Sequence, residues 1–208
     1  MHFKIIFKLD GTGVYYNPAE PIHLDSLLAW VLAPIHSTNM DLSRDDIPSE
    51  IPLPLMKKTI GDTWVWQASA LFPEGETIET LQYVRKRLRE SRIELIKGSP
   101  NVMSGPHRGY NIPLTLLCCT QMAAYASGNR KAVKKLLKQI KSLGKKRNSK
   151  VVGIDCEETE ENWSMIKDGK AMRWLPDDNG NRLVRPRPPY WNVHERVKCI
   201  EVGNECRV

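Results

Sequence analysis

The pattern that most constrains the fold is an amphipathic stretch over residues 129–143. Apolar residues recur there at the spacing of one helical face, at Val133, Leu136, Leu137, Ile140 and Leu143. This periodicity predicts a helix that packs one side on a core and turns Lys134, Lys138 and Lys141 to the opposite side. Gly144 stands where a helix C-terminal cap is favoured, and residues 151–155 then predict a strand. The core must therefore be shared by helix and sheet.

The N-terminal half predicts a strand, a helix and a second strand. Residues 3–9 alternate in polarity and end at the turn Asp10-Gly11-Thr12-Gly13. The apolar spacing of residues 24–31 predicts a short core helix that closes at Pro34. Residues 41–56 contain three prolines and predict a loop, and residues 63–70 predict the next strand.

Residues 77–97 fit two structures, because their apolar positions suit a helix while residues 83–89 also alternate as a basic strand. Asp168-Gly169 and Asn179-Gly180 are typical of hairpin turns. The whole order of elements predicts an α+β fold with helices on one face of a sheet. The 208 residues are enough for one domain with elaborations, so we expect a single domain over residues 1–208.

Composition and the distribution of apolar residues indicate the class of protein and the compartment in which we expect it. Hydrophobic residues make up 41% and charged residues 26%, as in soluble globular proteins. Lysines interrupt the apolar residues at the N-terminus, unlike in a signal peptide, and the longest apolar stretches are too short to span a bilayer. We expect a cytoplasmic protein with no membrane association. The five cysteines are odd in number and form no C-x-x-C pair, so neither a disulfide framework nor a zinc or other metal site is predicted.

Positive charge is concentrated in one segment. The chain has a net charge of +7, and residues 129–154 hold ten Lys or Arg and no acidic residue, whereas residues 155–161 hold five acidic residues and no basic one. Cations placed against phosphates release counterions and supply affinity without reading bases. A solvated helix face is the alternative interpretation for the helix alone.

The loop at residues 144–150 is the sharpest candidate within that segment. Gly144 is followed by Lys145, Lys146 and Arg147, then by small polar residues and Lys150. Backbone N–H groups and cations can approach phosphate oxygens together in such a loop. It lacks the G-K-[ST] of a P-loop and runs from helix to strand, the reverse of the Walker arrangement, which argues against an ATPase.

Two further surfaces could contact a nucleic acid. Residues 104–110 present Arg108 beside the rings of His107 and Tyr110, which could stack on unpaired bases. The second surface is rich in arginine and could track a backbone from a projecting hairpin, through Arg85, Lys86, Arg87, Arg89 and Arg92. An ordinary polar turn and a solvated helix are the alternative interpretations.

Several stretches together resemble a known family. They are residues 21–30 (PIHLDSLLAW), 64–69 (WVWQAS), 104–110 (SGPHRGY) and 185–191 (RPRPPYW), with the helix and glycine loop at 129–153 between the last two. In this order they resemble the RAMP superfamily of CRISPR-associated proteins, and within it the type IV effector subunit that holds the 5′ handle of the guide RNA. Lys150 and Val151 stand where the family loop usually has further glycines.

The resemblance implies a ferredoxin-like, RRM-related fold with β-hairpin elaborations and no cofactor. It implies a non-catalytic subunit that holds the crRNA 5′ handle and caps an antiviral or anti-plasmid complex beside backbone and large subunits. Lys145, Lys146 and Arg147 would contact handle phosphates, with His107, Arg108 and Tyr110 near handle nucleotides. The full set of RNA-binding candidates adds residues of the basic helix, the loop end and the arginine-rich segment, namely Lys134, Lys138, Lys150, Arg85 and Arg87.

Two other functions use the same residues. Some RAMP proteins cut their guide precursor, and His107 could act as general base beside Tyr110, with Lys146 stabilising the charged transition state. Residues 85–97 could instead contact a short motif in target DNA, although no recognition helix is identifiable. The Pro-rich tail at residues 185–191 either docks on a neighbour or lines the edge of the core.

Overall fold

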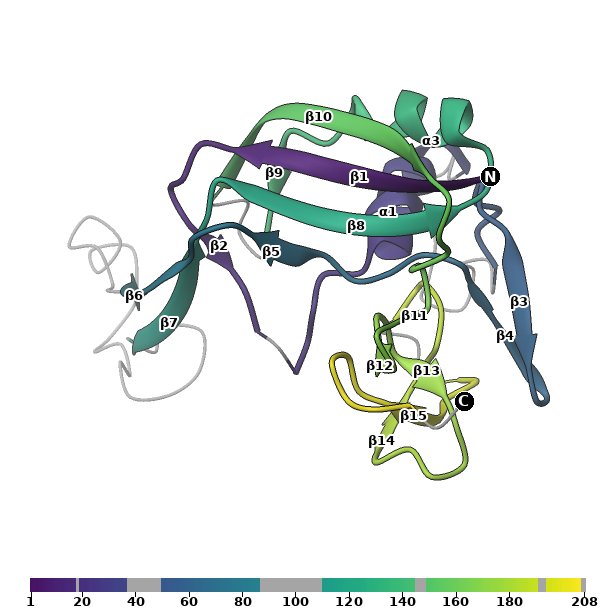
Figure 1. Cartoon of the computed structure of the whole chain (residues 1–208). Coiled ribbons are helices and arrows are strands. Elements are labelled where there is room, and N and C mark those ends of the chain that lie inside the picture. The colour runs from purple at the N-terminus through teal and green to yellow at the C-terminus, as the bar shows by residue number, and fades with distance from the viewer. Residues whose placement is uncertain (18, 37–49, 87–109, 145–148, 191–193, 207–208) are drawn as a thin grey trace, which may run out of the picture.

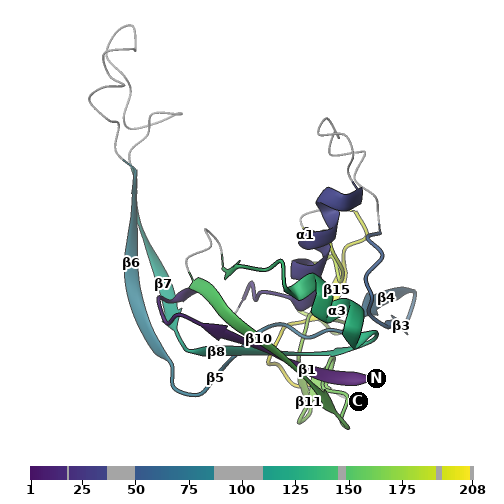
Figure 2. The same cartoon turned by 90° about the horizontal axis from the view of Figure 1, so that it is seen from above.

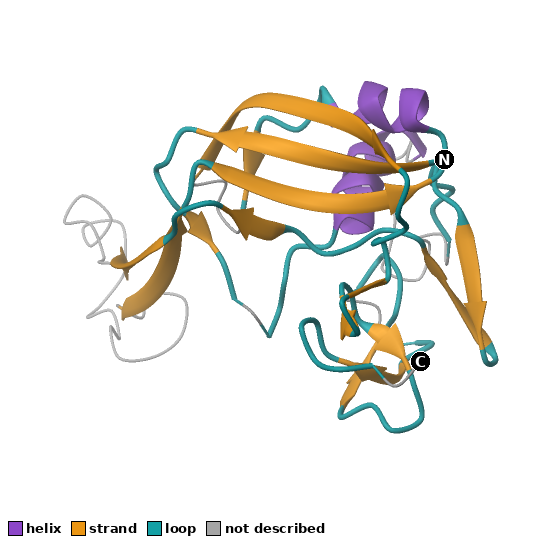
Figure 3. Ribbon diagram, viewed as in Figure 1, coloured by secondary structure: helices purple, strands orange, loops and turns teal. Residues whose placement is uncertain are grey.

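A curled antiparallel sheet forms the centre of the molecule (Figures 1 and 3). The computed structural model describes residues 1–17, 19–36, 50–86, 110–144, 149–190 and 194–206. Strand β1 (His2–Leu9) lies in the middle of five strands, between β8 (Gln121–Ser127) and β10 (Ser149–Thr159). Strands β5 (Phe72–Glu74) and β9 (Ser142–Leu143) form its edges.

Both described helices, α1 (Leu24–His36) and α3 (Arg130–Leu137), cover the same face of this sheet, as Figure 2 shows. The alternation of β1 points Phe3, Ile5 and Phe7 toward them, and all three are fully buried. Leu24 and Leu28 of α1 and Val133 and Leu137 of α3 complete this core. The prediction of an α+β fold with helices on one face is confirmed.

The opposite face of the sheet is neutralised by ion pairs and partly covered. Lys4 pairs with Glu74 at 2.6 Å, and Lys8 pairs with Asp155 at 2.7 Å. The ring of Trp163 packs edge-on against Tyr125 at 5.2 Å between centroids, and Lys167 lies over the Trp163 ring at 4.0 Å. Lys4 and Lys8 on this face thus already have carboxylate partners.

A long hairpin stands away from the main sheet (Figure 2). It pairs β6 (Ile78–Lys86) with β7 (Tyr110–Cys118), and the short strand β2 (Val14–Tyr15) lies on the other edge of β7. The ambiguity over residues 77–97 is therefore resolved as a strand over residues 78–86, and residues 87–97 lie outside the described part. The hairpin exposes Ile78, Leu81 and Tyr83.

Short strands dominate the remaining chain. Strands β3 (Lys57–Ile60) and β4 (Thr63–Trp66) form a hairpin, so the strand predicted over residues 63–70 is shorter, and Ala68 and Ala70 form only isolated bridges. Strands β11 (Ile166–Lys167) and β12 (Lys170–Ala171) flank the predicted turn at Asp168-Gly169, whose φ angles are 52° and 73°. That hairpin is confirmed.

The turn at Asn179-Gly180 joins two strands that do not pair with each other. Strand β15 (Val197–Ile200) lies between β13 (Leu175–Pro176) and β14 (Arg182–Val184) and pairs with both. The hairpin predicted here is wrong, because a strand from further along the chain takes the central place. Turn chemistry fixes only the local reversal of direction.

The two predicted helices have other ends in the structure. Helix α1 continues two residues past Pro34, to His36. Helix α3 ends at Leu137, and two tight bonds follow, from Gln139 N–H to the Leu136 carbonyl and from Ile140 N–H to the Leu137 carbonyl. Gly144 therefore does not cap the helix but follows strand β9. Among the described residues, no helix is long and apolar enough to cross a membrane.

Candidate nucleic-acid interface

A cleft of about 370 Å³ separates helix α3 from strand β10. Its cationic side is formed by Lys134, Lys138 and Lys141, and its floor by apolar residues that include Leu137, Ile140, Val151 and Ile154. A lysine-lined cleft with an apolar floor suits a flexible polyanion whose sugars and bases also carry apolar surface.

The helix is held in place at its N-terminus. The side chain of Asn129 accepts a hydrogen bond from Ala132 N–H at 3.1 Å, as an N-cap residue does. The Asn129 N–H donates to the Pro54 carbonyl, and the Gly128 N–H donates to the Met1 carbonyl. With Val133 and Leu137 buried against the sheet, the helical period turns the lysines outward.

Exposed lysines gather on helix α3 and on the segments that follow it, on the side of this cleft. Exposed lysines occupy six positions, Lys131, Lys134, Lys135, Lys138, Lys141 and Lys150. None of them forms an ion pair with a carboxylate of a described residue, whereas their neighbour Arg130 pairs with Glu158 at 3.2 Å. The contrast with the paired lysines of the opposite face makes this side the stronger candidate for phosphate contact.

Asp10 fixes the start of strand β10 beside the cleft. Its carboxylate accepts hydrogen bonds from the Thr12 hydroxyl at 2.8 Å, the Ser149 hydroxyl at 3.2 Å and Lys150 N–H at 3.2 Å. The Thr12 hydroxyl, with the other donors, lowers the pKa of Asp10. The Lys150 backbone is thereby held while its side chain is exposed.

The structure brings together only some of the predicted site residues. Lys134 and Lys138 line the cleft, and Lys150 lies in the β9–β10 pair opposite Ser142. The residues Lys145, Lys146, Arg147, His107, Arg108 and Arg87 lie outside the described part of the chain. The backbones of Arg85 and Tyr110 lie on paired strands near the outer end of the β6–β7 hairpin, which stands away from helix α3 (Figures 1 and 2).

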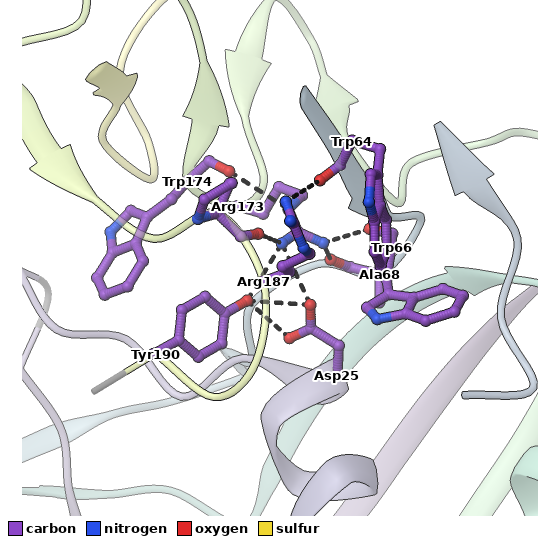
Figure 4. A network of polar contacts seen from close by, with 9 residues as sticks. Asp25, Trp64, Trp66, Ala68, Arg173, Trp174, Arg187 and Tyr190 are labelled. Carbon is purple, nitrogen blue, oxygen red and sulfur yellow. Dashed lines mark hydrogen bonds and ion pairs between the residues drawn. The ribbon is translucent and has the colours of Figure 1, made fainter. Parts of the chain in front are cut away.

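Sequence reasoning missed a buried charged network between α1 and the C-terminal segment (Figure 4). Arg173 is fully buried and donates to the carbonyls of Trp66, Ala68 (3.1 Å), Trp174 (3.3 Å) and Pro186 (2.5 Å). It also contacts the Asp25 carboxylate at 3.2 Å. The Tyr190 hydroxyl donates to Asp25 at 2.8 Å.

Burial dominates the electrostatics of this network. Burial raises the pKa of Asp25 even though Arg173 opposes the shift, and burial together with the Asp25 charge raises the pKa of Tyr190 well above its usual value. Tyr190 therefore keeps its proton and can donate it. His23 packs against the rings of both Trp174 and Tyr190, at 4.7 Å and 4.9 Å between centroids.

The described part of the tail, residues 185–190, lines the core edge, which is one of its two predicted positions. Arg185 and Arg187 are buried and share Glu195, at 2.7 Å and 2.9 Å. Arg187 also lies over the Trp64 ring at 4.5 Å. The Arg-Pro pattern in the sequence was the only signal of these contacts.

Comparison with known families identifies the group to which the chain belongs. A family model described as "CRISPR type IV associated protein Csf3" matches residues 2–101 and residues 96–202. The chain belongs to the Csf3 family. The two matches together span nearly all of it, so the resemblance to a type IV CRISPR-associated protein is confirmed. No curated protein matches the chain.

The Csf3 matches include every part of the arrangement described above. Asp25 falls in the first match, and Arg173 and Tyr190 fall in the second, so the buried network joins the two matched segments. Helix α3 and strand β10, which form the lysine cleft, both lie in the second match. Association with a type IV CRISPR complex follows from membership of the Csf3 family.

Proposed function

We propose that this Csf3-family protein is a non-catalytic RNA-binding subunit of a type IV CRISPR effector. In this proposal it holds the 5′ handle of the crRNA, caps the complex beside backbone and large subunits, and acts in the cytoplasm in antiviral or anti-plasmid defence. The observation that carries the proposal is the lysine-lined cleft between α3 and β10. Membership of the Csf3 family indicates that the cleft would work within a type IV CRISPR complex.

The spacing of the cleft lysines supports phosphate contact. Lys134 and Lys138 are four residues apart, across the last turn of α3 and its C-cap, where side chains lie about 5–6 Å apart between Cβ atoms. Lys141 continues the row beyond the helix end. A row of ammonium groups along one wall can follow a phosphate chain without reading bases.

The order of strands supports the ferredoxin-like, RRM-related interpretation. Four of the five central strands lie in the order β10-β1-β8-β5 and are all antiparallel to their neighbours. Helix α1 lies between β1 and β5 in the chain, and α3 lies between β8 and β10. The split β-α-β arrangement of a ferredoxin-like domain has this order, with the β6–β7 hairpin as an elaboration.

The helix side is a better RNA surface in this chain than the opposite sheet face. RRM domains bind single strands by stacking bases on aromatic residues of an open sheet. Here Trp163 and Lys167 pack over Tyr125, and Lys4 and Lys8 already pair with carboxylates. The proposal therefore places the phosphate path along α3 and β10.

The test measures RNA affinity against salt for two matched triple variants. One variant carries Lys134→Ala, Lys138→Ala and Lys141→Ala. The control removes three exposed lysines elsewhere, Lys58, Lys170 and Lys198, and so has the same net charge. The cleft variant should bind a labelled repeat RNA more weakly and reduce the salt slope by about 2, at roughly 0.7 for each phosphate contact to a single strand. Equal losses in the two variants would reject the cleft as the site.

The same RNA preparations distinguish the other two functions. RNA that is retained intact without metal supports the binding role. Defined cleavage products that disappear with His107→Ala would instead make the protein an endoribonuclease. Preferential retention of duplex DNA over RNA at equal salt would favour the contact with target DNA.

A further inference from the structure

A second, larger cleft lies at the base of the β6–β7 hairpin. Its volume is about 630 Å³, within the range of sites that hold small ligands. Tyr15, Tyr16 and Asn17 line one wall, and Pro113, Leu114 and Thr115 of strand β7 line another. Strand β2 pairs only with Leu116 and Leu117, so it ends before it would cover this part of β7.

The chemistry of the lining favours a nucleobase over a phosphate. The described lining residues include aromatic rings, threonines, one amide and the carboxylate of Glu79, and none of them is Lys or Arg. A carboxylate repels phosphate, whereas it accepts hydrogen bonds from the amino groups of bases. Tyrosine rings provide the flat apolar surface on which unpaired bases stack.

The cleft adjoins the basic segment through backbone contacts. A Cβ added at Gly144 would lie 3.2 Å from the backbone N of Tyr15, so the two backbones are in close contact. The chain continues from Gly144 into three cations in sequence, Lys145, Lys146 and Arg147. On the same β1–β2 connection, the Asp10 carboxylate accepts from the Lys150 N–H. A base in the cleft would thus lie close to the basic segment at Gly144.

We propose that the cleft lined by Tyr15 and Thr115 binds one unpaired nucleobase of the RNA whose phosphates the basic segment contacts. This inference rests on the proposed function and adds a base-reading subsite to it. Phosphate contacts would set the general affinity, and the cleft would fix which nucleotide lies beside Gly144. Binding to the full RNA would therefore combine a salt-dependent part with a part that depends on one base.

The test uses the purified full chain and a set of single-stranded repeat RNAs, each with one abasic position. Wild-type protein should lose roughly five- to 150-fold in affinity at one position, the range expected for one base stacked on an aromatic ring. Tyr15→Ala should weaken binding of the intact RNA by a similar factor and should no longer respond to that abasic position. Its salt slope should be unchanged, because no cation is removed.

Three further variants separate stacking from damage to the fold. Tyr15→Phe keeps the ring and should retain the response to the abasic position. Thr115→Trp fills the cleft from an exposed position and should reproduce the loss seen with Tyr15→Ala. Tyr83→Ala removes an exposed tyrosine outside the cleft and should bind as wild type. Thermal unfolding of each variant checks that it is folded.

Two results would overturn the inference in different ways. If RNA binds with a salt slope but no abasic position matters, or if Tyr15→Ala and Thr115→Trp bind as wild type, the base subsite is wrong and the proposed function stands. If wild-type protein shows no salt-dependent RNA binding, the proposed function fails and the subsite fails with it.

Discussion

The Tyr190 hydroxyl donates to the Asp25 carboxylate at 2.8 Å, although 165 positions separate the two residues in the sequence. Asp25 lies in the first turn of α1, and Tyr190 lies in the Pro-rich tail. Arg173 contacts both, at 3.2 Å and 3.1 Å. The C-terminal third is thus connected to the first helix by polar groups, of which Asp25 and Arg173 are fully buried.

Removing the tyrosine hydroxyl tests this connection with the smallest change. Tyr190→Phe keeps the ring packed on His23 but leaves a buried Asp25 oxygen without its donor. The free energy of unfolding should fall by about 1–3 kcal/mol, the cost of an unsatisfied buried acceptor. Urea unfolding measures it, and an unchanged midpoint would show that the hydroxyl contributes nothing.

Removing the guanidinium should be far more damaging. Arg173→Met leaves the Asp25 charge and several carbonyls buried without a partner, and should cost about 3–5 kcal/mol. Adding Asp25→Asn removes the unpaired charge, so the double variant should recover part of the loss. Strictly additive effects in this cycle would mean that the two side chains are not coupled.

His23 should make stability depend on pH. Burial and then the Arg173 charge lower its pKa in the folded protein well below 6.5, the value expected when unfolded. Below that pH the unfolded chain binds more protons, so the free energy of unfolding falls as pH falls, by up to about 1.4 kcal/mol per pH unit. The raised pKa of Asp25 has the opposite effect on the free energy of unfolding as the pH falls. The contribution of His23 must therefore be measured against a variant that lacks the imidazole.

His23→Phe provides that comparison, because neither ring nitrogen of His23 has a hydrogen-bond partner in the described structure. The variant should be about as stable as wild type at pH 8 and should lose less stability on acidification below pH 6.5. Chemical unfolding at several pH values measures both curves. Parallel curves would show that His23 is not the titrating group.

Gly128 should tolerate no side chain. Its φ is +154°, and an added Cβ would lie 2.5 Å from the Pro54 carbonyl oxygen and 2.7 Å from Leu55 Cα. Gly128→Ala should therefore destabilise the protein on the order of 3 kcal/mol. Gly61 also has positive φ but nothing within 4 Å, so Gly61→Ala should cost only about 1 kcal/mol. If both variants lost the same free energy of unfolding, the effect at Gly128 would come from backbone strain rather than from the clash.

The basic loop gives a prediction that comes from sequence alone. Lys145→Ala with Arg147→Ala should weaken binding to all RNA sequences alike and reduce the salt slope by about 1.4, for two phosphate contacts to a single strand. Affinity measured on two unrelated single strands checks the uniform loss. A loss confined to one sequence would make these residues base readers.

Local periodicity predicted burial better than it predicted element ends. Val133, Leu137, Ile140 and Leu143 are all buried, as the helical spacing indicated, but the last two reach the core from a turn and a strand. Residues 78–86 fit both periods, and their pairing with β7 decided for a strand. Such pairing is a non-local term that no window of sequence contains.

The cleft and the buried network were hidden from the sequence for related reasons. The helical period predicted that the lysines share one face of the helix. It could not predict which residues of β10 lie opposite them, because β10 pairs with β1 through a register shift at Leu9 and Val151. Arg173 looked like any surface cation, because its partner Asp25 lies 148 positions away. Charged residues are rarely buried, so nothing in the sequence around Arg173 indicated that its side chain would be buried.

The central place of β1 has a consequence for how the chain folds. His2 pairs with both Ser127 and Thr159, so β1 must wait for two partner strands that are synthesised much later. At synthesis rates of about 5–20 residues per second, both hydrogen-bonding edges of β1 stay unpaired for several seconds or more. Folding should be slow and governed by long-range pairing, and the nascent chain should depend on protection during that interval.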